Sequence, residues 1–174
     1  QPWHFVVVTD PDVKKTMSEF FVAESTKRAR MGMKFPTPNF RPLATAPAII
    51  VVVADFRWTK AFPMLGDGSE LDERYKENAE RILLQSVAAA TMSAQLAATA
   101  MGYGMWWVTA IGQEDAQNAL RPVLGVPDDL EILDIIVFGK PAKEQLRRWK
   151  KPIDDIRSWG TYNMDAYMSD DAID

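Results

Sequence analysis

The sequence predicts an α/β protein in which strands and helices alternate to form a layered sandwich. Three observations predict it. Four short runs rich in β-branched and aromatic residues indicate strands, at residues 3–8, 48–54, 105–109 and 132–138. Helical patterns separate these runs, and the longest holds twenty residues without a charge, from Ile82 to Met101. The chain of 174 residues is long enough for one domain with a substantial core.

The first half of the chain begins with the strand at residues 3–8. TDPDV follows, where Thr9 or Asp10 is the expected N-cap and Pro11 the first helical residue. The apolar spacing predicts a helix to about Ala23. Residues 24–47 are basic and contain several prolines, which predicts a partly helical excursion over the surface. The continuous apolar run AIIVVVA at 48–54 is typical of a strand buried on both faces.

The second half is organised around the uncharged helix at 82–101. Residues 55–69 predict a loop with an apolar side, and the charged helical pattern of 70–81 leads into the long helix. Gly102 should end that helix, and because it is apolar or small all round, we expect it to be buried on most sides. Six Ser, Thr and Gln side chains make it too polar for a transmembrane span. A short helix at 112–120 and a turn at RPVLGVPDD should separate the last two strands.

Composition excludes several kinds of site. The chain has no cysteine, which excludes disulfides, thiolate metal sites and a cysteine nucleophile. It has a single histidine, His4, which excludes a His-rich metal site; its place in a strand of large residues predicts a structural role. A net charge of −4 argues against a general nucleic-acid binder. Six tryptophans and nine methionines suit a pocket for a flat aromatic ligand and an ordinary core equally well.

Both ends of the chain carry a signal of their own. The sequence enters a strand directly from Gln1, without an initiating methionine, so we expect the chain to begin partway through a domain. Six cations between Lys140 and Lys151 oppose a single acid, Glu144. The tail after Pro152 is acidic and carries three aromatic rings, which predicts that it packs against another surface.

Several segments together resemble the FMN-dependent nitroreductase family, and their order and spacing fit it over nearly the whole chain. They are QPWHFVVVTDP at 1–11, the alanine-rich helix ending in MGYG at 101–104, WWVTAIG at 106–112, LGVPDDLEILDIIVFGKP at 124–141 and KKPIDDI at 150–156. The resemblance implies an α+β fold, a three-layer α-β-α sandwich with a central mixed sheet, as one domain over residues 1–174. It also implies an intertwined homodimer with FMN at the subunit interface. Residues 153–174 would be a C-terminal arm that packs on the partner subunit.

The resemblance assigns cofactor-binding roles to six residues. Trp107, Val108, Thr109 and Ala110 match the segment along the isoalloxazine edge, where backbone N–H groups near Thr109 and Ala110 face N5 and O4. Lys150 matches a cation that contacts the FMN phosphate, and Lys151 is its neighbour. By themselves the tryptophans would be read as core and the lysines as a solvated face. The family's N-terminal arginine-rich segment would precede Gln1, so we expect the chain to be incomplete there; the alternative is that this member has lost flavin.

The implied activity is that of a cytoplasmic NAD(P)H-dependent flavin oxidoreductase. NAD(P)H would bind transiently and pass hydride through FMN to a small electron-poor acceptor such as a nitroaromatic or a quinone. Because the flavin carries the chemistry, we expect no catalytic side chain, no metal, and neither nucleic acid nor membrane as a partner. Reductive dehalogenation and flavin destruction are alternatives within the family. A flavin-free dimeric binding or scaffold protein is an alternative of another class.

Overall fold

The structure is a computed structural model that describes residues 1–33, 38–61, 67–142 and 149–169. It divides into two compact units, Gln1–Pro141 and Ala142–Asp174, and each is described by itself below. Four stretches of the sequence predictions lie outside the described residues. They are 34–37 in the surface excursion, 62–66 in the predicted loop, 143–148 in the basic run and 170–174 at the end of the arm.

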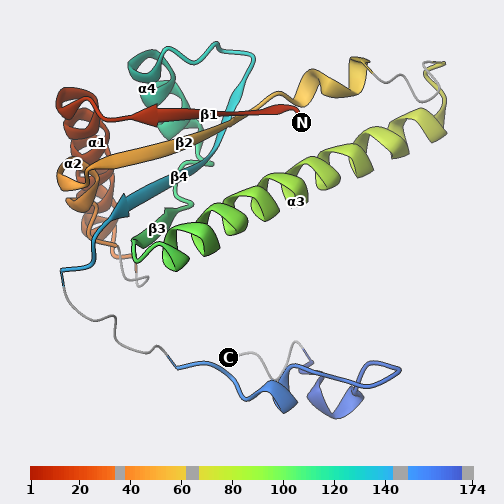
Figure 1. Cartoon of the computed structure of the whole chain (residues 1–174). Helices are drawn as coiled ribbons and strands as arrows, with labels where there is room; N and C mark the ends of the chain where they lie inside the picture. Colours follow the sequence, from red (N-terminus) through yellow and green to blue (C-terminus); the bar gives the residue numbers. More distant parts are fainter. Residues whose placement is uncertain (34–37, 62–66, 143–148, 170–174) are drawn as a thin grey trace. The chain divides into compact units, whose positions relative to one another are not determined.

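A four-stranded sheet in the order β1-β2-β4-β3 forms the middle of the first unit (Figure 1). Its strands are β1 (Trp3–Val8), β2 (Ala48–Ala54), β3 (Gly104–Val108) and β4 (Glu131–Gly139). All three pairings are antiparallel, so the expected mixed sheet is wrong for the described strands. Val8 lies opposite Ile49, which means that the connection from β1 returns the chain to the end of the sheet where β1 finished. Strand direction depends on this path and not on the strand's own residues.

Helices cover both faces of the sheet, which confirms the predicted three-layer α-β-α arrangement. The helices α1 (Pro11–Arg30), α2 (Pro42–Thr45) and α4 (Glu114–Leu124) lie on one face, and α3 (Glu70–Ala100) crosses the other (Figure 1). One core contains Met17, Leu43 and Leu120 between the three helices and the sheet. The second core contains Leu83 and Val87 of α3 against the opposite face. A 3₁₀ helix, η1 (Phe56–Ala61), follows β2.

The first helix begins where the sequence predicts and ends later. Asp10 caps it, since its Oδ1 accepts hydrogen bonds from the backbone N–H groups of Asp12 and Val13 at 2.8 and 3.1 Å. The helix continues past Ala23 to Arg30. The prediction stopped where the apolar spacing stopped, but the basic last turn suits the negative end of the helix dipole. Gly32, with φ of +75°, then turns the chain away.

The long helix α3 joins the charged segment and the alanine-rich segment into one helix of 31 residues. Ser69 caps its start, accepting a hydrogen bond from Asp72 N at 3.3 Å, and Gly102 ends it with φ of +79°, as predicted. By length and composition α3 could cross a membrane, the one helix of the described residues that could. One side of it nevertheless packs on the sheet through Leu83 and Val87.

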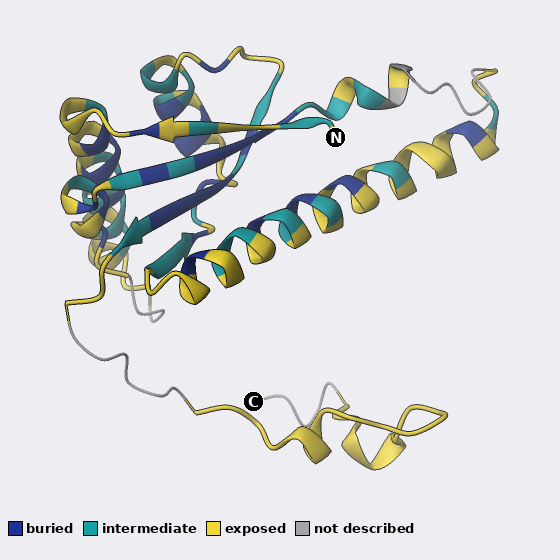
Figure 2. Cartoon of the chain, in the orientation of Figure 1, coloured by how far each residue is buried: buried dark blue, intermediate teal, exposed yellow. Residues whose placement is uncertain are grey.

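The opposite side of α3 is exposed (Figure 2). Six exposed residues recur every three or four positions along it; we call them the outer seam: Ile82, Gln85, Ala89, Met92, Leu96 and Thr99. Leu96 is 64% exposed. The expectation that this helix is buried on most sides is therefore wrong for a single chain, because one sheet covers only one side of a helix.

The helix α4 extends beyond its predicted end at residue 120. It runs to Leu124 through Pro122 and ends at Gly125, whose φ is +64°. The prediction took Pro122 as the start of a turn. Proline removes one backbone donor near the helix end, and Leu124 in the added turn packs against the core.

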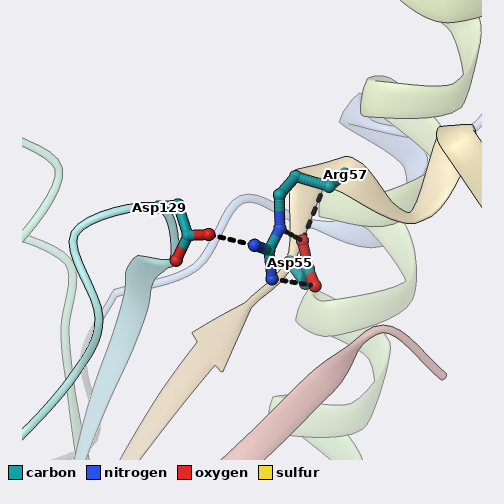
Figure 3. Close-up of polar contacts among 3 residues, drawn as sticks. All are labelled: Asp55, Arg57 and Asp129. Atoms are coloured by element: carbon teal, nitrogen blue, oxygen red, sulfur yellow. Dashed lines mark hydrogen bonds and ion pairs between the residues drawn. The ribbon is translucent and has the colours of Figure 1, made fainter.

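An exposed ion-pair cluster ties the end of β2 to the loop before β4 (Figure 3). Arg57 donates from Nε and Nη2 to the two carboxyl oxygens of Asp55 at 2.8 and 2.9 Å, and from Nη1 to Asp129. The side-chain hydrogen bond from Arg57 holds the pKa of Asp55 below its usual value, and the same bond raises the pKa of Arg57. The cluster keeps η1 beside the start of β4.

The described part of the second unit contains two short 3₁₀ helices, Ile153–Asp155 and Met164–Ala166. Every residue described in 149–169 is exposed. The large apolar side chains exposed there are Trp149, Ile153, Ile156, Trp159, Tyr162, Met164, Tyr167 and Met168. So many exposed large apolar side chains are unusual for the surface of a soluble protein.

Candidate functional site

The predicted flavin-binding segment lies at the end of the edge strand β3. Trp107 and Val108 are the last residues of the strand, and Thr109 and Ala110 follow it. Val108 is buried in the core beside α4, Ala110 is partly buried, and Thr109 is exposed. Strand β3 thus supplies a rigid support for a short exposed loop.

The backbone N–H groups of Thr109 and Ala110 are free to bind a ligand. Within the described residues, neither donates a hydrogen bond to a carbonyl or a side-chain oxygen. Two adjacent free donors at the end of a rigid strand suit a ligand edge that carries hydrogen-bond acceptors. The flavin ring edge is of this kind, so the residues present fit the cofactor that the sequence predicts.

A buried polar contact lies under the start of this segment. Trp107 donates from Nε1 to Oδ1 of Asp134 at 2.6 Å, and Thr91 of α3 donates from Oγ1 to Oδ2 of the same carboxyl group at 2.7 Å. Asp134 is only 6% exposed and Thr91 is fully buried. The side chain of Trp107 therefore points to the α3 side of the sheet, where Asp134 of β4 holds it and Thr91 of α3 in turn holds Asp134.

A second buried contact lies at the end of the segment. The side chain of Gln117 in α4 donates from Nε2 to the backbone carbonyls of Ile111 and Ile132 at 3.0 and 2.6 Å. Its Oε1 accepts from Ile132 N at 3.0 Å. Gln117 is 5% exposed, so these bonds form away from water. They connect the loop after β3 to strand β4.

The two predicted phosphate-binding residues, Lys150 and Lys151, are exposed and belong to the second unit. His4 is exposed on the edge strand β1. Trp106 packs on the opposite face from Trp107, with its ring 5.5 Å from that of Phe40, as the core interpretation predicts.

Sequence reasoning missed Asp134, Thr91 and Gln117. A signal for the first was present, because Asp134 is the one charged residue in the strand ILDIIVF and a buried carboxyl group needs hydrogen-bond partners. Its partners come from other elements and have no local signature. No group of three or more His, Asp or Glu side chains within the described residues lies close enough to hold a metal ion.

Comparisons with known proteins agree with this fold. A protein of Archaeoglobus fulgidus named "Putative NADH dehydrogenase/NAD(P)H nitroreductase" is 30% identical over 145 residues, which are 83% of this chain. The matched region spans 64% of that protein, less than two thirds of its length.

Solved structures show the same fold. The NfrA1 nitroreductase of Bacillus subtilis superposes with a TM-score of 0.68 at 18% identity, covering 93% of this chain and 58% of that one. A protein of Parabacteroides distasonis, named like the A. fulgidus relative, gives 0.61 at 24% identity, covering 92% and 74%. The sequence pattern of the Nitroreductase family matches residues 1–140, more than half of the chain. This chain belongs to the nitroreductase family.

Proposed function

We propose that the chain is an FMN-dependent oxidoreductase that uses NAD(P)H to reduce an electron-poor acceptor, such as a nitroaromatic or a quinone. Family membership supports flavin chemistry in general. The observation that carries the proposal is the pair of free backbone N–H groups at Thr109 and Ala110, on a loop supported by β3. When bound, FMN supplies the hydride chemistry, so the protein's contribution is binding and orientation.

The roles of the site residues follow from their chemistry. The N–H groups of Thr109 and Ala110 donate to the polar edge of the ring, and buried Val108 holds the backbone that carries them. Fixed backbone donors stabilise charge on the ring without a titrating side chain. Lys150 and Lys151 supply cations for the phosphate of FMN. Both lysines are exposed and therefore accessible to an anion.

We also propose that the working unit is a cytoplasmic homodimer. The outer seam repeats every three or four residues along α3, which is the spacing at which one helix packs along another. The exposed apolar residues of 149–169 supply a second surface, and they suit an arm that packs on the partner subunit. Large apolar surfaces of this kind are typical of obligate interfaces.

The proposal is tested by flavin titration of the purified protein and of two variants at one position. Ala110→Pro removes the N–H group, whereas Ala110→Ser keeps it and serves as the matched control. We expect the wild type and Ala110→Ser to bind FMN and to oxidise NADH or NADPH with a quinone acceptor. Ala110→Pro should bind FMN at least about tenfold more weakly, because one charge-stabilising donor is lost. Circular dichroism checks that each variant is folded.

Two results would contradict the proposal. One is a wild-type protein that binds no FMN at micromolar concentration. The other is a folded Ala110→Pro variant with full flavin occupancy and unchanged NADH oxidation, which would show that the free N–H groups do not contact the ring.

A further inference from the structure

Two buried side chains hold the ends of the segment that carries the free N–H groups. Asp134 holds Trp107 at its beginning, and Gln117 holds the carbonyl of Ile111 at its end. Thr109 and Ala110 lie between these two fixed points. Neither Asp134 nor Gln117 belongs to the predicted ligand-contacting residues.

The two side-chain contacts, Asp134 with Trp107 and Gln117 with Ile132, flank one β-bulge in β4. The register of β4 against β2 shifts between the pairs Val52–Asp134 and Val53–Ile132, which leaves Leu133 as an extra residue. Leu133 packs in the α3-side core, and Asp134 meets Thr91 of α3, so two consecutive residues face the same side. Such a bulge redirects a side chain that regular alternation would place on the other face. Ile132, on the near side of the bulge, is the residue bonded to Gln117.

We propose that Asp134 and Gln117 are positioning residues that set the flavin-binding conformation of residues 107–111 before flavin binds; this rests on the function proposed above. The direction of the Thr109 and Ala110 N–H groups is determined by where the backbone enters and leaves the segment. A buried hydrogen bond at each end restricts both points. Binding then costs less conformational entropy, because the donors are already aligned.

The opposing interpretation is that the two side chains only stabilise the core, as satisfied buried polar groups commonly do. The two interpretations differ in what happens to folded variants. Loss of a core contact lowers stability and leaves the affinity of the folded protein for flavin unchanged. Loss of a positioning contact lowers flavin affinity at conditions where the variant is fully folded.

The main variants are Asp134→Leu, which removes both acceptors at similar volume, and Gln117→Leu, which removes the bonds to Ile111 and Ile132. Asp134→Asn is the conservative rescue, because its amide oxygen still accepts from Trp107 while its NH₂ group donates to Thr91. Lys14→Met is the matched control. Lys14 is a buried polar residue whose Nζ donates to the carbonyls of Ala46 and Pro47 at 2.7 and 3.5 Å, and within the described residues it makes no hydrogen bond to the segment.

The first readout is the dissociation constant for FMN and for riboflavin. We expect Asp134→Leu and Gln117→Leu to raise both constants about tenfold, since the segment contacts the ring that the two flavins share. Asp134→Asn should remain within about threefold of the wild type, and Lys14→Met within about twofold. If Asp134→Leu does not fold, Thr91→Val takes its place, because it preserves volume and removes one of the bonds that fix Asp134.

The second readout needs no flavin. In the apo-protein labelled with ¹⁵N-tryptophan, the indole N–H of Trp107 should be protected from exchange in the wild type and in Asp134→Asn, and unprotected in Asp134→Leu. Folded leucine variants with wild-type affinity for both flavins would overturn the proposal. A wild type that binds neither flavin while its Trp107 indole is protected would instead contradict the proposed function and leave the two contacts as purely structural.

Discussion

The outer seam of α3 allows a quantitative test of the dimer through the substitution Leu96→Lys. Leu96 is 64% exposed in the single chain, so a partner could still bury nearly two thirds of it. Full burial of a leucine side chain contributes about 1.5–3 kcal/mol, and 64% of that is about 1–2 kcal/mol. A symmetric dimer contains the residue twice, which gives about 2–4 kcal/mol. Since about 1.4 kcal/mol changes an equilibrium constant tenfold, the dimer dissociation constant should rise about 30- to 1000-fold.

The effect should fall toward the lower end of this range if the lysine stem stays on the interface and its ammonium group reaches water. Leu84→Lys is the matched control. Leu84 lies on the same helix and is 47% exposed, but it is outside the outer seam. We expect this control to leave the dimer dissociation constant within about threefold of the wild type.

Sedimentation equilibrium over a concentration series measures the dissociation constants of the three proteins, with circular dichroism as a check of folding. A wild type that is a stable, folded monomer at micromolar concentration would refute the reasoning. So would a Leu96→Lys protein that dimerises as strongly as the wild type. Equal weakening by Leu84→Lys would show that the interface is not confined to the outer seam of α3.

Three further predictions concern the rest of the chain. Lys150→Glu should weaken FMN binding at least about tenfold and leave riboflavin binding almost unchanged, whereas the control Lys140→Glu should leave both flavin affinities unchanged. Equal FMN affinities for the two variants would contradict phosphate contact by Lys150. Deletion of residues 159–174 should weaken both the dimer and flavin retention, measured by sedimentation and by the flavin absorbance of the purified protein; undiminished dimerisation would show that the arm is not part of the interface. Arg57→Met should raise the titration midpoint of Asp55 in an NMR pH series, because Arg57 holds that pKa below its usual value of 3.8. The contribution of the Asp55 carboxylate to stability is accordingly present at neutral pH and is lost as the pH falls below 3.8 through the lowered pKa of Asp55. An Asp55 titration midpoint that Arg57→Met leaves unchanged would contradict the Arg57–Asp55 ion pair.

The strands and caps could be predicted because their signals are local. The run WHFVVV gave a strand with the observed bounds, and the cap at Asp10 follows from a carboxyl group placed before Pro11. Gly102 marked the end of α3 because a left-handed turn favours glycine. The bounds of α1 and α4 were predicted too short. In both, favourable charge or burial on the sheet extends the helix past the last clear periodic signal.

Pairing and burial could not be predicted, since they depend on residues far apart in the sequence. The antiparallel sheet follows from the paths between strands, and the exposed outer seam follows from the fact that α3 meets only one sheet. The resemblance proposes residues 107–110 as a binding segment, but the buried contacts that hold its ends come from other elements. A one-residue bulge in β4 points the side chain of Asp134 toward Thr91 and Trp107. The bulge has no signature in the strand sequence.

The sequence by itself determined the family, the layered fold and the place of the helix–strand unit that carries WWVTAIG, because apolar periodicity, caps and short motifs are properties of neighbouring residues. Only the tertiary structure decided which side of α3 stays exposed in the single chain and which buried side chains contact the loop. The physical reason is that a buried polar group must find its hydrogen-bond partner in space. For Asp134 and Gln117, those partners are brought together only when α3, α4 and β4 pack around the end of β3.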